Sequence, residues 1–141
     1  MNRLAMLTVA VGLVAAACGG TSAFDLAVGD CFDDPSSFDE VTTVAAVSCE
    51  DPHDNEVSAN VQMTGGSDYP GDDVVASFAD DACFEAFERY VGATYAESSL
   101  DYAWLAPTRQ SWEQRDDRIV TCIVYDTERA KLVGSVRASG R

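Results

Sequence analysis

Five cysteines constrain this chain more than any other feature of its sequence. Cys18 follows an apolar N-terminal segment directly, and the other four cysteines are spread over the remaining residues. Without Cys18 the count is even, as expected for disulfides formed in an oxidising compartment. The four are Cys31, Cys49, Cys83 and Cys122. The sequence therefore predicts a fold held together by two covalent links.

Four cysteines allow three pairings. We favour Cys31–Cys49, which would link two neighbouring N-terminal strands, and Cys83–Cys122, which would link a helix to a C-terminal strand. In the chain-entropy model each bridge stabilises the fold by about 3–4 kcal/mol. The alternative is a zinc site built from all four thiolates. Zinc ligands usually come in close pairs, and no two of these cysteines lie within four residues of each other.

The first 17 residues have the features of a signal peptide. Arg3 supplies the positive charge, residues 4–14 are mostly apolar, and small residues at 15–17 precede Cys18. The apolar run is shorter than the roughly 20 residues of a transmembrane helix. Small residues leading into a cysteine resemble the lipobox of bacterial lipoproteins, which implies that Cys18 becomes acylated and starts the mature chain. The alternative is ordinary secretion without a lipid.

The mature chain is strongly acidic. It keeps eight basic and 24 acidic residues, a net charge of −16, because cleavage removes only Arg3 among the charged residues. Such a chain is repelled by phosphate backbones, so we expect no nucleic-acid partner. Anionic lipid headgroups repel it too, so membrane attachment is expected to depend on the acyl chains of Cys18 alone. These features predict a lipid-anchored protein on the outer face of the plasma membrane.

The pattern of apolar residues predicts one α+β domain. After a short tether at residues 18–23, the domain is expected to fill residues 24–141. It would be an antiparallel β-sheet with one main helix packed on it. A polar loop is expected at residues 108–117. Strands are expected at residues 24–32, 41–49, 56–63, 100–105, 118–125 and 131–136.

The helix is expected to start at a cap at Asp72 or Asp73 and to stop before Gly92. Phe84 is an exception to its amphipathic pattern, because this residue projects towards the polar side. Phe84 therefore has two interpretations, namely a contact with the segment at residues 95–100 or an exposed contact for a partner. The predicted apolar face contains Val75, Phe78, Ala79, Ala82, Cys83, Ala86 and Tyr90.

The only histidine of the chain lies in an acidic turn. Asp51, His53, Asp54 and Glu56 offer one imidazole and three carboxylates, a set that suits several divalent metals. The alternative is a structural turn in which His53 and Asp54 bond to the local backbone. The sequence lacks the ligand spacing of a calcium-binding loop. His53 and Asp54 are also candidate contacts for a partner.

Trp112 has two interpretations as well. It either packs in the core or presents a surface ring that stacks on a sugar of a wall polymer or anchors a protein partner. The sequence contains no nucleophile motif of the G-x-S-x-G or S-x-x-K type and no glycine-rich phosphate loop. We therefore expect neither an enzyme nor a cofactor.

Several short motifs stand in order along the domain. The first two are VGDCF at residues 28–32 and VSCEDPHDNEV at residues 47–57. YVG, APT, DRIVTCIV and VGS follow at residues 90–92, 106–108, 117–124 and 133–135. Together they resemble the septum-formation family of actinobacterial cell-envelope proteins. The resemblance implies a link to septation, and it supplies no catalytic residues.

These observations favour a non-enzymatic binding or adaptor domain in the assembly of the envelope or septum. Its partner is expected to be an envelope protein, a division protein or a wall polymer. A second hypothesis is a divalent-metal-binding envelope protein. A third is a cell-wall hydrolase that uses two of the abundant carboxylates.

Overall fold

The computed structural model describes residues 20–37 and 41–141. Its six strands form one antiparallel sheet in the order β1-β3-β2-β4-β6-β5. The predicted α+β class is therefore confirmed. Among the described residues, no helix is long and apolar enough to cross a bilayer. The strands are β1 (Thr21–Ser22), β2 (Cys31–Asp33), β3 (Thr43–Val47), β4 (Asn55–Gln62), β5 (Leu100–Leu105) and β6 (Ile119–Asp126), and the helices are α1 (Asp72–Val91), α2 (Arg109–Arg115) and the short 3-10 turns η1 (Ala23–Asp25) and η2 (Tyr95–Glu97).

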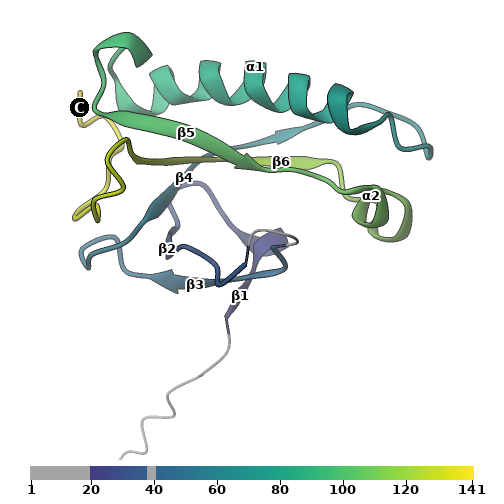
Figure 1. Ribbon diagram of the computed structural model, residues 1–141, viewed down its shortest axis with the longest axis horizontal. Coiled ribbons are helices and arrows are strands. Elements are labelled where there is room, and N and C mark those ends of the chain that lie inside the picture. The colour runs from purple at the N-terminus through teal and green to yellow at the C-terminus, as the bar shows by residue number, and fades with distance from the viewer. Residues whose placement is uncertain (1–19, 38–40) are drawn as a thin grey trace, which may run out of the picture.

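The sheet is covered on both faces. α1 lies across one face of β4, β6 and β5, whereas β1, β3 and β2 lie below the other face (Figure 1). Apolar side chains fill both layers. Those between α1 and the sheet include Val75, Ala79 and Phe87 of the helix and Val120 and Val124 of β6, and those on the opposite face are Leu26, Phe32, Val44, Val57 and Ile123. β6 lies between β4 and β5, as its nearly continuous apolar run predicts.

α1 ends as the sequence predicts and begins with a different cap. Its N-cap is Gly71, so Asp72 and Asp73 lie in the first turn. Negative side chains at this position stabilise a helix, because they interact with the positive end of its dipole. Gly92 closes the helix with a φ of 79°, a left-handed conformation that glycine adopts without strain, and its N–H donates to the Glu88 carbonyl at 3.0 Å. Phe87 and Val91 are also buried, in addition to most of the predicted apolar face.

Both predicted disulfides are present. Cys31–Cys49 links β2 to the end of β3, and Cys83–Cys122 links α1 to β6 beneath it. Each pair has a Cα–Cα distance of 5.2 Å, within the ordinary range for a disulfide. Both Cys83 and Cys122 are completely buried, so this bridge lies inside the core.

Two predicted strands are wrong over most of their length. Residues 24–30 form η1 and a turn, and the strand is confined to Cys31–Asp33. Gly29 has a φ of 96°, and Asp30 accepts a hydrogen bond from the Ala27 amide at 2.8 Å, so the backbone turns instead of extending. Residues 131–136 contribute one isolated bridge, Leu132 to His53, because the Gly134 amide donates to the Cys49 carbonyl and the Val136 amide to the Glu56 side chain, and neither bond continues a strand.

The predicted polar loop at residues 108–117 is also wrong, because residues 109–115 form the helix α2. Its N-terminus carries a capping box. The Thr108 side chain accepts from the Ser111 amide at 3.1 Å, and the Thr108 amide donates to Ser111 Oγ at 3.0 Å. The signal for this helix was the Thr-x-x-Ser spacing, which is weaker than the usual Glu or Gln at the fourth position.

Candidate binding surface

The predicted metal-ligand cluster does not form. His53 is completely buried, with Nδ1 2.8 Å from the Asp51 carbonyl, and its Nε2 is buried without a hydrogen-bond partner. In the part of the chain that the structure describes, the one grouping of metal-ligand types is Cys31, Cys49 and Glu56. Its two sulfurs are joined in a disulfide, so no thiolate is left to hold an ion.

Glu56 holds the C-terminal segment in place. Its carboxylate is completely buried and accepts hydrogen bonds from three donors, namely the Tyr90 hydroxyl at 2.6 Å, the Ser135 hydroxyl at 2.6 Å and the Val136 amide at 2.7 Å. Burial and the Glu56 hydrogen bond raise the pKa of Tyr90, so this phenol stays a donor. Glu56 is thus a structural anchor, because its oxygens are already bonded within the protein.

Asp54 is neutralised by a cation of the same chain. Its Oδ2 accepts from Lys131 Nζ at 2.9 Å and from the Asp34 amide at 2.9 Å, and Lys131 also bonds Asp33 at 2.7 Å. Partial burial on its own raises the pKa of Asp54, but the Asp34 amide and Lys131 outweigh it, so the net pKa is lowered. The predicted bond to the local backbone is present for His53, whereas the partners of Asp54 are distant in the sequence. Both residues nevertheless have structural partners within the chain.

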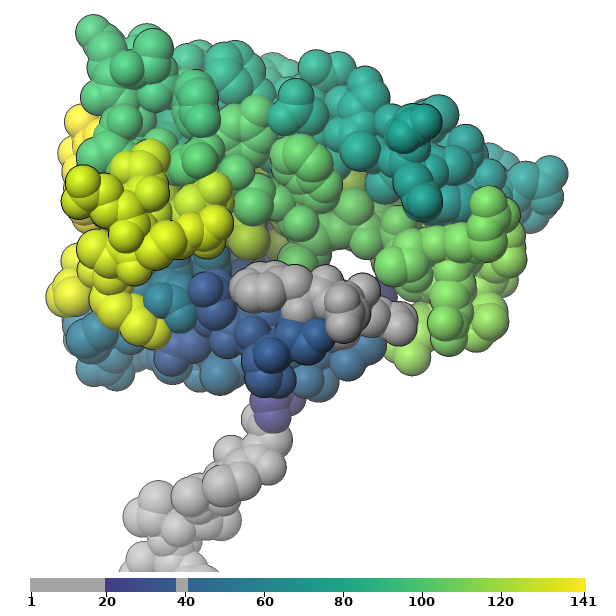
Figure 2. Space-filling view, in the orientation of Figure 1, coloured from purple at the N-terminus to yellow at the C-terminus, as the bar shows by residue number. Residues whose placement is uncertain are grey.

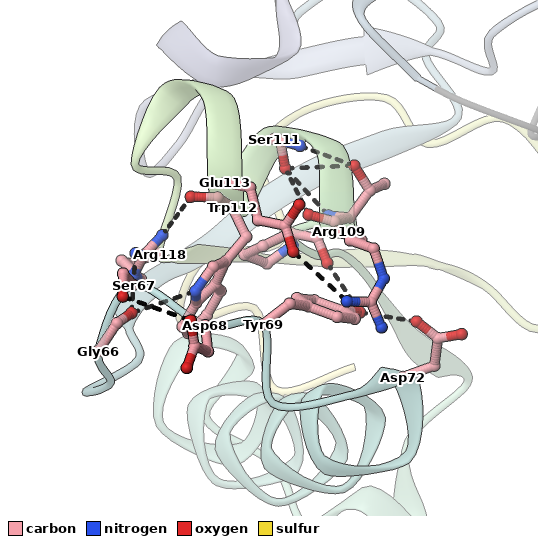
Figure 3. A network of polar contacts seen from close by, with 12 residues as sticks. Gly66, Ser67, Asp68, Tyr69, Asp72, Arg109, Ser111, Trp112, Glu113 and Arg118 are labelled. Carbon is pink, nitrogen blue, oxygen red and sulfur yellow. Dashed lines mark hydrogen bonds and ion pairs between the residues drawn. The ribbon is translucent and has the colours of Figure 1, made fainter.

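Trp112 is enclosed, so its interpretation as an exposed stacking ring is wrong. Its exposed fraction is 1%. The indole N–H donates to the Gly66 carbonyl at 3.2 Å, and the guanidinium of Arg118 lies 3.7 Å from the ring centroid (Figure 3). Arg118 also bonds the carbonyls of Gly66 and Trp112, at 3.0 and 2.9 Å. A cation and a loop from the same chain thus cover this ring.

Phe84 belongs to an exposed group of aromatic rings at the edge of the sheet. We call this group the edge aromatic surface; it consists of Phe84, Tyr95, Tyr102 and Trp104. The Phe84 ring lies 5.8 Å from Tyr95 and 6.1 Å from Tyr102, and Tyr102 lies 6.3 Å from Trp104. The predicted contact of Phe84 with the segment at residues 95–100 is present, because its ring contacts Tyr95, and the side chain remains 42% exposed.

Three elements position these rings. Phe84 comes from α1, Tyr95 from η2, and Tyr102 and Trp104 from alternate positions of β5. Since successive strand side chains point to opposite faces, residues 102 and 104 share a face and lie beside α1. β5 is the last strand of the sheet, so only one of its two edges is paired in the described structure. The rings therefore lie at an open border of the fold.

Carboxylates are placed among these rings. The Tyr102 hydroxyl donates to Asp80 at 2.8 Å, and the Tyr95 hydroxyl donates to Asp101 at 2.8 Å. Glu88 accepts from the Tyr95 amide at 3.1 Å. Burial and the Asp80 hydrogen bond raise the pKa of Tyr102 to about 12, and the hydrogen bond to Asp101 raises that of Tyr95. Both phenols therefore remain protonated and act as hydrogen-bond donors.

A cleft lies on the other side of the sheet, between the N-terminal strands and β5 with α2 (Figure 2). It has two adjoining parts of about 340 and 510 Å³, which share Val41 and Leu105 in their walls. Asn60 donates to the Leu26 carbonyl at 2.7 Å, and Asn55 donates to Asp34 at 2.8 Å. Its asparagines thus hold the N-terminal segment against the sheet.

The septum formation family model matches residues 28–140. The chain belongs to the septum formation family. No curated protein and no solved structure matches it. Membership associates the domain with septum formation during cell division. The edge aromatic surface lies wholly inside the part of the chain that the septum formation model covers.

The sequence indicates only part of this surface. Phe84 is visible as an aromatic residue on the polar side of an amphipathic helix, and the predicted strand at 100–105 puts Tyr102 and Trp104 on one face. Tyr95 gives no such signal, because η2 is too short to show a period. Cys18, the predicted site of lipid attachment, lies outside the described residues.

Proposed function

We propose that this septum formation protein is a non-enzymatic binding module, anchored by lipid at Cys18 to the outer face of the plasma membrane. Its partner is an envelope or division protein that binds over the edge aromatic surface. The single observation that supports this proposal is the exposure of neighbouring aromatic rings, Phe84 at 42% and Tyr95 at 36%, at an open edge of the sheet. Exposed aromatic clusters are typical of the energetic centres of protein interfaces.

Photo-crosslinking inside dividing cells tests the binding part of this proposal. Phe84 is replaced by benzoylphenylalanine, which keeps an aromatic ring at that position. A matched control carries the same group at Val133, which is 64% exposed and belongs to the C-terminal segment. We expect an adduct with an envelope or division protein from position 84 only. Equal adducts from both positions, or none from position 84, would contradict the proposal.

Metabolic labelling with an alkyne analogue of palmitate tests the anchor. The wild-type chain is expected to take up the label and to sediment with membranes, whereas Cys18→Ala is expected to lose both properties. Uptake of the label by Cys18→Ala would place the lipid elsewhere and contradict this part. A fluorescent fusion of the protein and deletion of its gene test the septal role. This role is wrong if the fluorescence is spread evenly around dividing cells and the deletion strain forms normal septa.

A further inference from the structure

The edge aromatic surface differs from the other aromatic clusters in lacking a cation. Five rings of the described structure have a guanidinium above them, at 3.7 to 5.0 Å from the ring centroid. They are Phe24, Tyr69, Tyr90, Trp112 and Tyr125. No such pair involves a ring of the edge aromatic surface within the same described residues. A cation over an aromatic face is attracted by the quadrupole of the ring.

Among the described residues, no basic side chain is left to fill this role. Arg3 lies outside the described residues, and the other eight basic residues all have partners elsewhere. Five lie over the rings named above, and Lys131, Arg89 and Arg141 pair with carboxylates, Arg89 with Glu85 at 3.5 Å. Because Arg3 belongs to the predicted signal peptide, we expect a cation for the edge aromatic surface to come from another molecule.

Carboxylates of α1 lie beside the exposed rings, where they could pair with such a cation. Asp80 and Glu88 lie four residues before and after Phe84, so they border its ring on the same helix face. Asp80 bonds the Tyr102 hydroxyl and Glu88 bonds the Tyr95 amide, and neither carboxylate has an ion pair within the described part of the chain. A carboxylate accepts several hydrogen bonds, so both retain acceptor capacity for an incoming ammonium or guanidinium.

The backbone edge of β5 is partly blocked. The Tyr102 amide donates to the Asp101 carboxylate at 2.8 Å, and the Leu100 amide donates to Ser98 Oγ at 3.0 Å. Both amides are therefore already bonded to side chains, a device that limits pairing with a further strand. Recognition at this border is expected to depend on side chains more than on β-strand addition.

We propose that the edge aromatic surface binds a lysine- or arginine-rich segment of a partner protein, with the cationic side chains over the rings and against Asp80 and Glu88. This inference rests on the proposed function and adds the chemistry of the partner. The negative charge of the domain, 19 acidic and one basic residue between positions 18 and 101, attracts such a segment from a distance.

Fluorescence anisotropy tests the inference with the full-length chain in neutral detergent. The probes are labelled peptides of alternating lysine and serine, glutamate and serine, or glutamine and serine. We expect the lysine peptide to bind at least about tenfold more tightly than either of the others, and more weakly as salt is added. Equal binding of the three peptides, or no binding of the lysine peptide, would overturn the inference.

Matched variants locate the binding. Asp80→Asn/Glu88→Gln should weaken the lysine peptide about fivefold or more, whereas Glu50→Gln/Glu128→Gln removes the same charge elsewhere and should have a smaller effect. Phe84→Ala should weaken binding, and Val74→Ala, an exposed apolar residue ten positions away on α1, should not. Equal effects within either matched pair would mean that the peptide binds by total charge or elsewhere.

The proposed function and this inference fail in different ways. An adduct from position 84 whose crosslinked segment lacks lysine and arginine would overturn the inference and leave the proposed function intact. If no adduct forms at that position, the proposed function itself is contradicted.

Discussion

The aromatic cluster around Trp112 and the edge aromatic surface contain similar residues, but the first is enclosed by the chain and the second is open to solvent. At Trp112 the chain supplies Arg118 at 3.7 Å from the ring, and the ring is 1% exposed. At Phe84 the described residues supply carboxylates and no cation, and the ring is 42% exposed. In this comparison the ring with an internal cation, Trp112, is enclosed by the fold, and the ring without one, Phe84, is open to solvent.

The largest expected effect is on stability at Trp112. Trp112→Ala should reduce the free energy of unfolding by about 3–5 kcal/mol, because it empties a completely buried site. Urea denaturation measures the loss, with Trp104→Ala as the half-buried control. If the Trp104 variant loses as much free energy as the Trp112 variant, the contrast between the two clusters is wrong.

A smaller loss is expected when the internal cation is removed. Arg118→Met should cost about 1–3 kcal/mol, since the carbonyls of Gly66 and Trp112 lose a charged donor. Arg109 is the matched control, because it lies over Tyr69 at 5.0 Å with a side chain that is 65% exposed. Arg109→Met should stay within about 0.5 kcal/mol of the wild type in the same denaturation experiment. Similar losses of unfolding free energy in the two variants would mean that burial of the guanidinium does not affect stability.

Phe84→Ala should change stability by no more than about 1 kcal/mol, because much of the ring is already in water. Binding of the lysine peptide should nevertheless fall. Thermal unfolding and anisotropy on the same preparation separate the two effects. A large loss of stability with unchanged binding of the peptide would show that Phe84 is a structural residue, as Trp112 is, and would contradict its role in binding.

The smallest expected effect extends the comparison to carboxylates. Asp54 has an internal cation, Lys131, and its pKa lies below the ordinary value of 3.8. Because the pKa is lower in the folded state than in the unfolded state, the ionised carboxylate stabilises the fold at pH values above 3.8. This contribution is lost as the pH falls through the lower pKa of the folded state. Asp54→Asn should therefore be less stable than the wild type near neutral pH, by up to about 1 kcal/mol, and equally stable in strong acid.

Denaturation at several pH values measures this difference, with Glu128→Gln as an exposed control. A difference between Asp54→Asn and the wild type that grows as the pH falls would contradict the assignment of Asp54 as a structural carboxylate.

The sequence predicts the parts of this fold that repeat a local pattern. The strand at 56–63, the amphipathic helix up to Gly92 and the strand at 100–105 all reappear, and both disulfides follow from the elements that carry the cysteines. The predicted alternation within the first of these strands is wrong, because a bulge between Val57 and Ala59 shifts its register. The sequence does not predict the local structure of a segment whose conformation depends on a residue far away in the chain. Residues 131–136 have the composition of a strand, but their backbone bonds to Glu56, about 80 residues earlier.

The candidate site shows the same division. The position of Phe84 on the polar side of the helix was evident, because helical spacing fixes it. The burial of Trp112 was not, because it depends on Gly66 and Arg118, which are brought to it by the fold. Likewise, the sequence does not show that no cation of the described residues lies over the rings of the edge aromatic surface, because this depends on where the fold places each of those basic residues.

Fluorine NMR on the chain labelled with 5-fluorotryptophan tests the central claim most directly. The protein has two tryptophans, one in each cluster, and Trp104→Phe assigns their resonances. During titration with the lysine peptide, the account predicts that the Trp104 resonance shifts and the Trp112 resonance stays in place. A shift of Trp112 alone, or equal shifts of both, would contradict it.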